Sequence, residues 1–212
     1  MNHTMKLSLQ IDELLDAFGI EKRRDDSHFN FWHQVKYVLS DDDQRILAKL
    51  HQRVLAFSDS WNEEELKMNF ISFVLFLADI DEPRSIRTFF ERPLSGVIDG
   101  YSISVKTDCM IARPKGIGTP QAPYFFLQEF KKSKGDKNDP EGQMLAAMLL
   151  AQHLNNDGKR IYGSWLVGSF WHFTILEGKT YYQSQSFDAT NYPDLEQIVY
   201  ILRKLKPLIL ER

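Results

Sequence analysis

Three residues in two apolar stretches of the sequence have the types and spacing of a metal site. Asp108 lies in the stretch VKTDCMIA, while Glu129 and Lys131 lie in PYFFLQEFKK. Side chains along a β-strand point alternately to opposite faces, so Glu129 and Lys131 share one face and Phe130 takes the other. If the two strands are neighbours, Asp108 joins them on that face. The pattern therefore predicts two carboxylates and an ammonium group converging at the surface of a sheet.

The chemistry expected of such a site is metal-assisted hydrolysis of a phosphate ester. Mg²⁺ prefers hard oxygen ligands and keeps several waters, so Asp108, Glu129 and the backbone carbonyl of Phe130 are its expected ligands, with Mn²⁺ as a substitute. The metal acidifies a bound water and neutralises charge developing on the phosphate, while Lys131 orients the nucleophile or stabilises charge at phosphorus. The alternative is a solvated strand edge, because the spacing Asp…Glu-x-Lys is common by chance.

The residues after Pro93 have the pattern of strands, which would supply the frame for this site. Asp99-Gly100 separates two apolar stretches, and a two-residue turn of this type needs positive φ at both positions, so it predicts a β-hairpin. Gly168-Ser169 predicts a second hairpin turn. The expected strands cover residues 94–98, 101–105 with a continuation through 107–112, 124–131, 161–167, 170–176 and 180–187.

The residues before about Phe90 have the spacing of helices instead. Ser40 is a candidate cap for a helix over 41–57, and Ser60 or Asn62 for a buried helix over 58–79. Further helices are expected over 27–39, 140–154 and 193–206.

This order of elements predicts an α/β fold with a mixed central sheet flanked by helices. The expected organisation is one domain over residues 1–212. About 1–90 would form an N-terminal helical part, about 91–190 the sheet core that carries the site, and 191–212 a C-terminal helix.

Composition limits the classes of protein and the cell compartment. Apolar residues make up 43% of the chain, enough for a sizeable core, and no apolar run approaches the ~18–20 residues of a membrane span. The start lacks the pattern of a signal peptide, and the single cysteine, Cys109, excludes an internal disulfide. A reducing cytoplasm is the expected location. Next to Asp108, Cys109 is expected to be a small buried residue that faces away from the site.

Charge and motifs exclude some functions and leave others open. The net charge of −3 argues against a nonspecific nucleic-acid coat, although a local basic groove stays open. The six histidines form no HxH or HExxH pair, so zinc hydrolysis has no support. A serine-hydrolase elbow and a P-loop are also missing from the sequence.

Five stretches, which cover roughly residues 60–180, carry a resemblance to a known family. In chain order they are WNEEELKMNFIS, ERPLSGVIDGYSISVKTDCMIA, APYFFLQEFKK, DPEGQMLAAMLLAQ and IYGSWLVGSFWHFTIL. They resemble those of a family of small bacterial PD-(D/E)XK nuclease-like proteins, seen especially in Bacteroides-type genomes. The resemblance implies a restriction-endonuclease-like fold, and it places the catalytic aspartate at Asp108 rather than Asp99.

The same resemblance implies roles for residues outside the central trio. In this family the helix that follows the Glu-x-Lys strand supplies a glutamine, here Gln143, and an upstream helix often supplies a glutamate. Of Glu63, Glu64 and Glu65, Glu63 shares a helical face with apolar residues and is the expected choice. The proline of the family's first half-motif is Thr107 here, at a position that varies and makes no metal contact.

The leading hypothesis is Mg²⁺-dependent hydrolysis of nucleic acid, with DNA as the expected substrate and no membrane partner. Lys132, Lys134 and Arg113 are candidate phosphate contacts. Nuclease folds often pair to cut two strands, so a homodimer is one expected assembly. Two rivals stay open: a noncatalytic nucleic-acid- or protein-binding module that retains the fold, and a metal-dependent hydrolase of nucleotides or other small phosphates.

Overall fold

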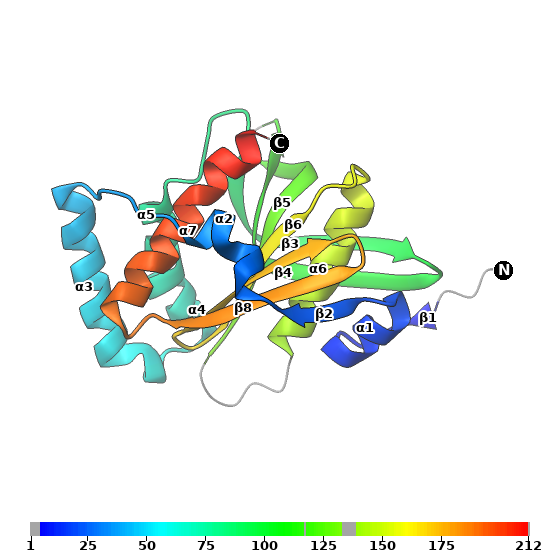
Figure 1. Cartoon of the computed structure of the whole chain (residues 1–212), viewed down its shortest axis with the longest axis horizontal. Helices are drawn as coiled ribbons and strands as arrows, with labels where there is room; N and C mark the ends of the chain where they lie inside the picture. Colours follow the sequence, from blue (N-terminus) through cyan, green and yellow to red (C-terminus); the bar gives the residue numbers. More distant parts are fainter. Residues whose placement is uncertain (1–4, 117, 133–138, 212) are drawn as a thin grey trace.

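The chain folds into an α/β structure built on one mixed eight-stranded sheet (Figure 1). The computed structural model describes residues 5–116, 118–132 and 139–211. The strands are β1 (Met5–Lys6), β2 (Glu21–Arg24), β3 (Arg87–Ile98), β4 (Tyr101–Lys115), β5 (Thr119–Lys131), β6 (Ile161–Val167), β7 (Phe170–Glu177) and β8 (Thr180–Asp188). The helices are α1 (Ile11–Phe18), η1 (Asp26–Phe29), α2 (Asn30–His33), α3 (Asp41–Phe57), η2 (Ser58–Ser60), α4 (Glu63–Leu66), η3 (Lys67–Ile71), α5 (Ser72–Ala78), α6 (Pro140–Asn155) and α7 (Tyr192–Leu210).

The sheet combines antiparallel hairpins with one helical crossover. Its strand order is β1-β4-β5-β6-β7-β8-β2, with β3 also paired to β4. Strand β4 is antiparallel to β3 and β5, and β7 is antiparallel to β6 and β8, whereas the short edge strands β1 and β2 lie parallel to β4 and β8. Strand β5 lies parallel to β6, a pairing that requires a long connection, and α6 lies within that connection. The sheet is therefore mixed, as the sequence predicts.

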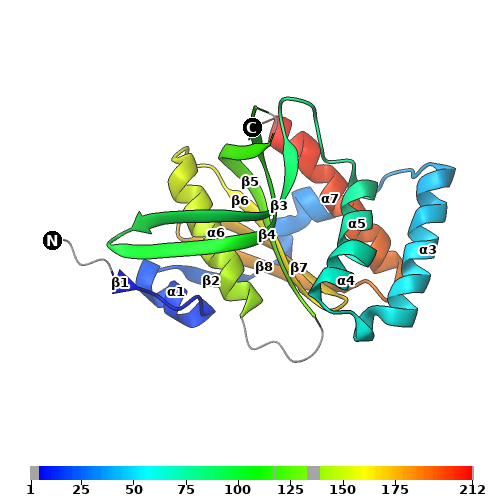
Figure 2. The same ribbon diagram turned by 180° about the vertical axis from the view of Figure 1, so that it is seen from behind.

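Two apolar layers cover the two faces of the sheet. Helices α3, α5 and α7 lie on one side, while α1 and α6 lie on the other, as Figure 1 and the reverse view in Figure 2 show. Cys109 and Phe130 pack into the first layer, whereas Met110 and Leu127 pack into the second. Strand alternation therefore places Asp108 and Glu129 on the face that α6 covers.

The start of α6 is fixed by a tight approach to α1. Asp139 caps α6 by accepting the Gly142 N–H at 2.9 Å, and its other oxygen accepts the Ile11 N–H at 2.8 Å. A Cβ atom on Gly142 would lie 2.2 Å from the backbone oxygen of Leu9, so no larger residue fits there without moving backbone. This approach fixes the first turn of α6, which carries Gln143.

Several local predictions are confirmed. Helix α3 covers Asp41–Phe57, and the Ser40 hydroxyl accepts the Asp43 N–H at 3.1 Å. Asn62, rather than Ser60, caps α4 in a reciprocal arrangement with Glu65. The turn residues Asp99 and Gly100 both have positive φ, at 49° and 85°.

Other elements differ from the prediction in their bounds or in their type. The helix expected over 27–39 is limited to the short turns η1 and α2, and residues 1–90 also contribute β1, β2 and the start of β3. Strand β3 runs through Pro93, which is tolerated because β3 pairs with β4 alone among the described strands and so is an edge strand. Helix α7 extends past its expected end and includes Pro207.

Two further features concern the helices. The helix expected over 58–79 is interrupted by the π-helical segment η3, a distortion that is frequent at functional sites. Within the described ranges, no helix is long and apolar enough to cross a membrane.

Candidate active site

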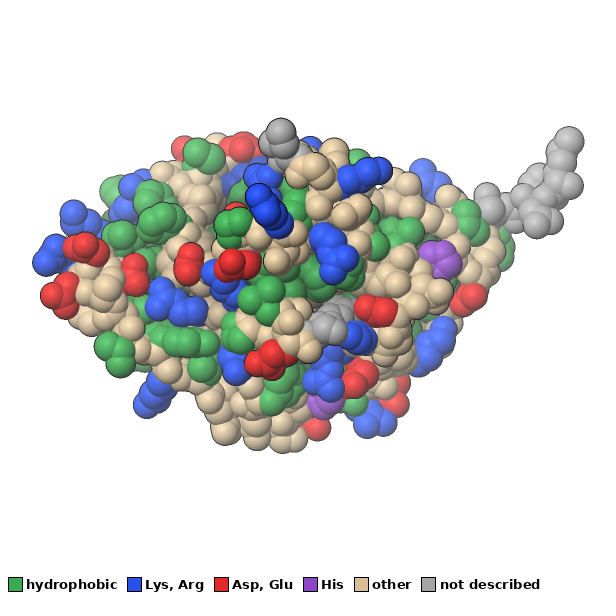
Figure 3. All heavy atoms as spheres, turned by 90° about the horizontal axis from the view of Figure 1, so that it is seen from above, with side chains coloured by type: hydrophobic (Ala, Val, Ile, Leu, Met, Phe, Trp, Pro, Cys, Tyr) green, Lys and Arg blue, Asp and Glu red, His purple; other side chains and the backbone are tan. Residues whose placement is uncertain are grey.

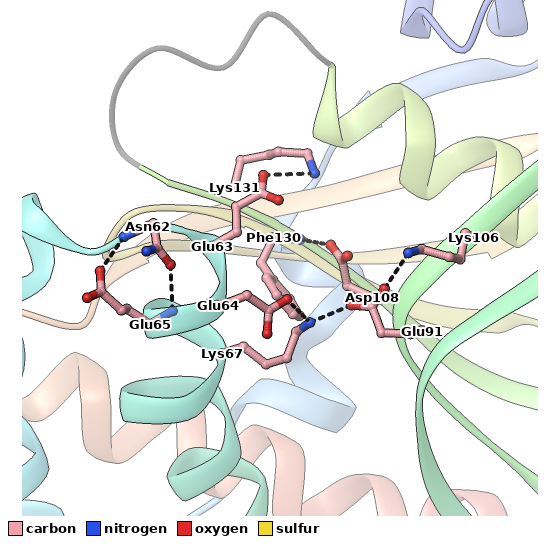
Figure 4. Close-up of polar contacts among 10 residues, drawn as sticks. All are labelled: Asn62, Glu63, Glu64, Glu65, Lys67, Glu91, Lys106, Asp108, Phe130 and Lys131. Carbon is pink, nitrogen blue, oxygen red and sulfur yellow. Dashed lines mark hydrogen bonds and ion pairs between the residues drawn. The ribbon is translucent and has the colours of Figure 1, made fainter.

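Strands β4 and β5 bring Asp108 and Glu129 together on one face of the sheet. The strands pair at Met110–Leu127 and Cys109–Gln128, so Asp108 and Glu129 are the next residues in the same register. The Asp108 Oδ2 atom accepts the backbone N–H of Phe130 at 2.9 Å (Figure 4). The proximity that strand alternation predicted is therefore present in the structure.

One pocket of about 440 Å³ contains all five of the expected catalytic residues. Its walls come from the start of α4 and η3, from β3, β4 and β5, and from the first turn of α6. The acidic and basic residues that line it are Glu63, Glu64, Lys67, Glu91, Lys106, Asp108, Glu129 and Lys131, and the other lining residues are Leu9, Ser104, Val105, Phe130 and Gln143.

Burial disfavours the ionised forms of both central carboxyl groups, and most strongly that of Glu129. Burial raises the pKa of Glu129 well above its ordinary value, and the neighbouring charge of Asp108 raises it further. Burial also raises the pKa of Asp108, although the Phe130 N–H and the charge of Lys131 oppose this. A proton or a cation between the two groups would relieve the repulsion.

Lys131 lies beside this pair as a charged group. Its Nζ atom lies 3.2 Å from Glu63 Oε1, and only 7% of the residue is exposed. Burial lowers the pKa of Lys131, but the negative charges of Asp108 and Glu63 outweigh it, so the pKa is raised. Lys131 is therefore protonated at neutral pH without metal, which suits an orienting or charge-stabilising role rather than that of a base.

The structure separates the three consecutive glutamates that the sequence left as alternatives. Glu65 accepts the Asn62 N–H at 2.9 Å in the cap of α4, and Glu64 pairs with Lys67 at 2.8 Å. Glu63 is the one that pairs with Lys131 (Figure 4). Glu63, the glutamate that helical spacing favoured, is therefore the one that reaches Lys131.

Sequence reasoning missed three charged residues of the pocket. Lys67 follows Glu63 by four residues and Lys106 precedes Asp108 by two, so helix and strand periodicity could have placed both near the site. Glu91 gave no such signal, because it adopts a left-handed backbone with φ of 55° that interrupts the β3–β4 ladder opposite Asp108.

Two of the expected phosphate contacts, Arg113 and Lys132, do not line this pocket in the described part of the chain. Arg113 lines a separate cleft with Arg84 and Lys159, while Lys132 follows β5 and is not one of the pocket's lining residues. Lys134 lies outside the described residues.

Two sequence expectations about the neighbours of Asp108 agree with the structure. Cys109 is fully buried in the opposite apolar layer, and burial raises the pKa of its thiol. Thr107 is also buried, and its hydroxyl donates to the Arg92 carbonyl of β3 at 3.1 Å, while Thr107 is not among the residues that line the pocket.

The oxygen atoms of the pocket fit a hard divalent cation. Among the residues that the structure describes, no three His, Cys, Asp or Glu side chains are grouped to hold a metal. Asp108 and Glu129 would therefore be partial ligands, with water and the Phe130 carbonyl completing a sphere of the kind Mg²⁺ accepts. Glu129 Oε1 is buried and has no hydrogen-bond partner within the described part of the chain, as expected of a vacant ligand atom.

Replacing Glu129 with glutamine is expected to stabilise the metal-free protein by about 0.5–2 kcal/mol at pH 8, a usual size for a stabilising substitution. Because the folded-state pKa of Glu129 is raised from its ordinary 4.5, wild-type stability is lost as pH rises above that value, and the amide removes this loss. Thermal unfolding in EDTA at pH 4.5 and pH 8 measures the effect. Asp42→Asn, a change at an exposed position, serves as the control. A Glu129→Gln protein that is less stable than wild type at pH 8 would contradict the claim that ionised Glu129 destabilises the fold.

Comparisons with known proteins assign no family to the chain. No protein-family model matches it, and no curated protein matches it. What the chain does must therefore be inferred from the chemistry of the pocket.

Proposed function

We propose that this protein hydrolyses phosphodiester bonds of nucleic acid, with DNA as the expected substrate, through a metal-dependent PD-(D/E)XK site on a restriction-endonuclease-like fold. The observation that carries the proposal is the pairing of the half-buried Asp108 with the buried Glu129, with the charged Lys131 beside them in one pocket. The order of a hairpin, β5, α6 and β6 around this pair, and the glutamine at the start of α6, give further support.

Each residue has a role that follows from its position. Asp108, Glu129 and the Phe130 carbonyl would hold Mg²⁺, with Mn²⁺ as a substitute. When bound, the ion would acidify a water and neutralise charge developing on the phosphate. Lys131, held by Glu63, would orient the nucleophile and stabilise the phosphate's charge. The buried Gln143 Oε1, which has no described hydrogen-bond partner, would accept a hydrogen bond from the attacking water.

The charge of the pocket favours metal-dependent binding over simple attraction of a polyanion. The lining contains more carboxylates than lysines, so without a cation it repels phosphate. Figure 3 shows acidic and basic side chains interspersed on the face seen from above, without one continuous basic surface there. A noncatalytic nucleic-acid-binding module would rely on such a surface rather than on a pair of adjacent carboxylates.

The direct test is cleavage by the wild-type protein of supercoiled plasmid, single-stranded DNA, RNA and free nucleotides. We expect cleavage of DNA in Mg²⁺ or Mn²⁺ and none in EDTA. Binding of nucleic acid without cleavage under all metal conditions would overturn the proposal in favour of a noncatalytic module. Turnover of free nucleotides alone would overturn it in favour of a small-phosphate hydrolase.

A further inference from the structure

A second charged cluster in the pocket, beside the proposed metal ligands, has the geometry of a phosphate clamp. We propose that Lys67 and Lys106 bind a phosphate of the substrate next to the scissile one, and that Glu91 occupies this clamp in the free protein until nucleic acid displaces it. This inference rests on the proposed function, whose nucleic-acid substrate supplies the phosphate.

The contacts of Glu91 match those that a phosphodiester would make. Lys67 Nζ lies 2.5 Å from Glu91 Oε1, and Lys106 Nζ lies 2.6 Å from Glu91 Oε2. Each lysine therefore holds a different oxygen of one singly charged anion (Figure 4). A phosphodiester offers two non-bridging oxygens and the same charge, and lysine binds phosphate as a point charge.

The clamp adjoins the central carboxylates. Lys67 lies over the Phe130 ring, 5.8 Å from its centroid, and the Phe130 N–H is the donor that binds Asp108. Lys106 lies two residues before Asp108 on the same strand. A phosphate held by the two lysines would therefore lie next to one bound at the proposed metal site.

Displacement of Glu91 leaves no buried charge without a partner. The Lys67 side chain is only 12% exposed and keeps its second contact with Glu64 at 2.8 Å, while an incoming phosphate replaces the first. The Glu91 side chain is 37% exposed, so it can move into water.

The backbone of Glu91 also distinguishes it from an ordinary surface ion pair. Its positive φ of 55° is uncommon for glutamate, and residues held in such conformations cluster at functional sites. The π-helical segment that begins at Lys67 is a second local irregularity at the same contact. Two distortions that meet at one ion pair support a functional contact.

The experiment measures binding of a fluorescently labelled DNA duplex in Mg²⁺, in a Lys131→Met background that retains both carboxylates and is expected to cleave about 10²–10³-fold more slowly than the wild-type protein. Glu91→Gln is expected to tighten binding about fivefold, because the competing anion is removed. Lys67→Gln and Lys106→Gln are each expected to weaken it about fivefold and to reduce the slope of log K against log[salt] by about 0.9.

Matched controls lie on α3, which does not line the pocket. Asp42→Asn and Lys49→Gln make the same changes in charge and are expected to bind as the background does. Glu91→Asn is a second variant, because asparagine tolerates positive φ, and it should also tighten binding.

Tighter binding by either Glu91 variant, together with the reduced salt slopes, would support the clamp. If the Glu91 variants bind no tighter than the Lys131→Met background, or both lysine variants keep the salt slope of that background, Glu91 and its lysines are only structural and the clamp is wrong. That failure is separate from failure of the proposed function, which is judged by whether the wild-type protein cuts nucleic acid in Mg²⁺.

Discussion

Replacing Asp108 with asparagine is expected to reduce Mg²⁺-dependent cleavage by about 10³-fold, since the stabilisation lost with the metal amounts to several kcal/mol. Asparagine has nearly the same shape, and its carbonyl oxygen can still accept the Phe130 N–H that Asp108 now accepts at 2.9 Å. The fold should therefore survive while the anionic ligand is lost. Single-turnover cleavage rates measure the effect, and thermal unfolding in EDTA verifies that the variant is folded.

The matched control for this variant is Asp99→Asn. Asp99 is the other aspartate of the same hairpin, it has a φ of 49° in the turn, and asparagine tolerates that conformation. The Asp99 variant is expected to cut as wild type does. Cleavage by a folded Asp108→Asn protein within threefold of the wild-type rate would reject Asp108 as a metal ligand.

Replacing Lys131 with methionine is expected to produce the second large effect, a fall of about 10²–10³-fold in the rate of cleavage. This is the usual loss when one group that stabilises transition-state charge is removed. Methionine keeps much of the apolar stem in this buried position but removes the ammonium group that pairs with Glu63. Metal binding should be retained, because Asp108 and Glu129 are intact. Cleavage kinetics combined with calorimetric Mn²⁺ titration distinguish this variant from Asp108→Asn.

Two comparisons make the Lys131 prediction specific. Lys49→Met removes an exposed lysine of α3 and is expected to leave cleavage unchanged. Lys131→Arg retains the charge and should recover part of the lost rate. A Lys131→Met protein that binds Mn²⁺ and cuts at the wild-type rate would exclude Lys131 from the chemistry.

Local signals account for the part of the site that the sequence predicted. The Asp99-Gly100 turn sets the β3–β4 hairpin, and alternation along β5 sets the common face of Glu129 and Lys131. Asn62 caps α4 with Glu65, so helical spacing could direct Glu63 toward the pocket. Each of these features depends on residues a few positions apart, which is the range over which sequence patterns are informative.

The features that the sequence did not predict depend on contacts between distant residues. Strand β2 has the sequence EKRR, without apolar alternation, and it exists because it pairs with β8 about 160 residues later in the chain. The position of Glu91 depends on two lysines from other elements and on a left-handed backbone that glutamate seldom adopts. Arg113 resembled a phosphate contact by its place in a loop, but it lines the separate cleft with Arg84.

The central claim is that Asp108 and Glu129 form a site for a divalent metal, and the most direct measurement is anomalous diffraction from crystals soaked in Mn²⁺. The account predicts a peak between the two carboxylates in the wild-type protein and its loss in crystals of Asp108→Asn. A wild-type structure in millimolar Mn²⁺ with no peak at this position, or with the peak unchanged in the Asp108→Asn variant, would contradict it.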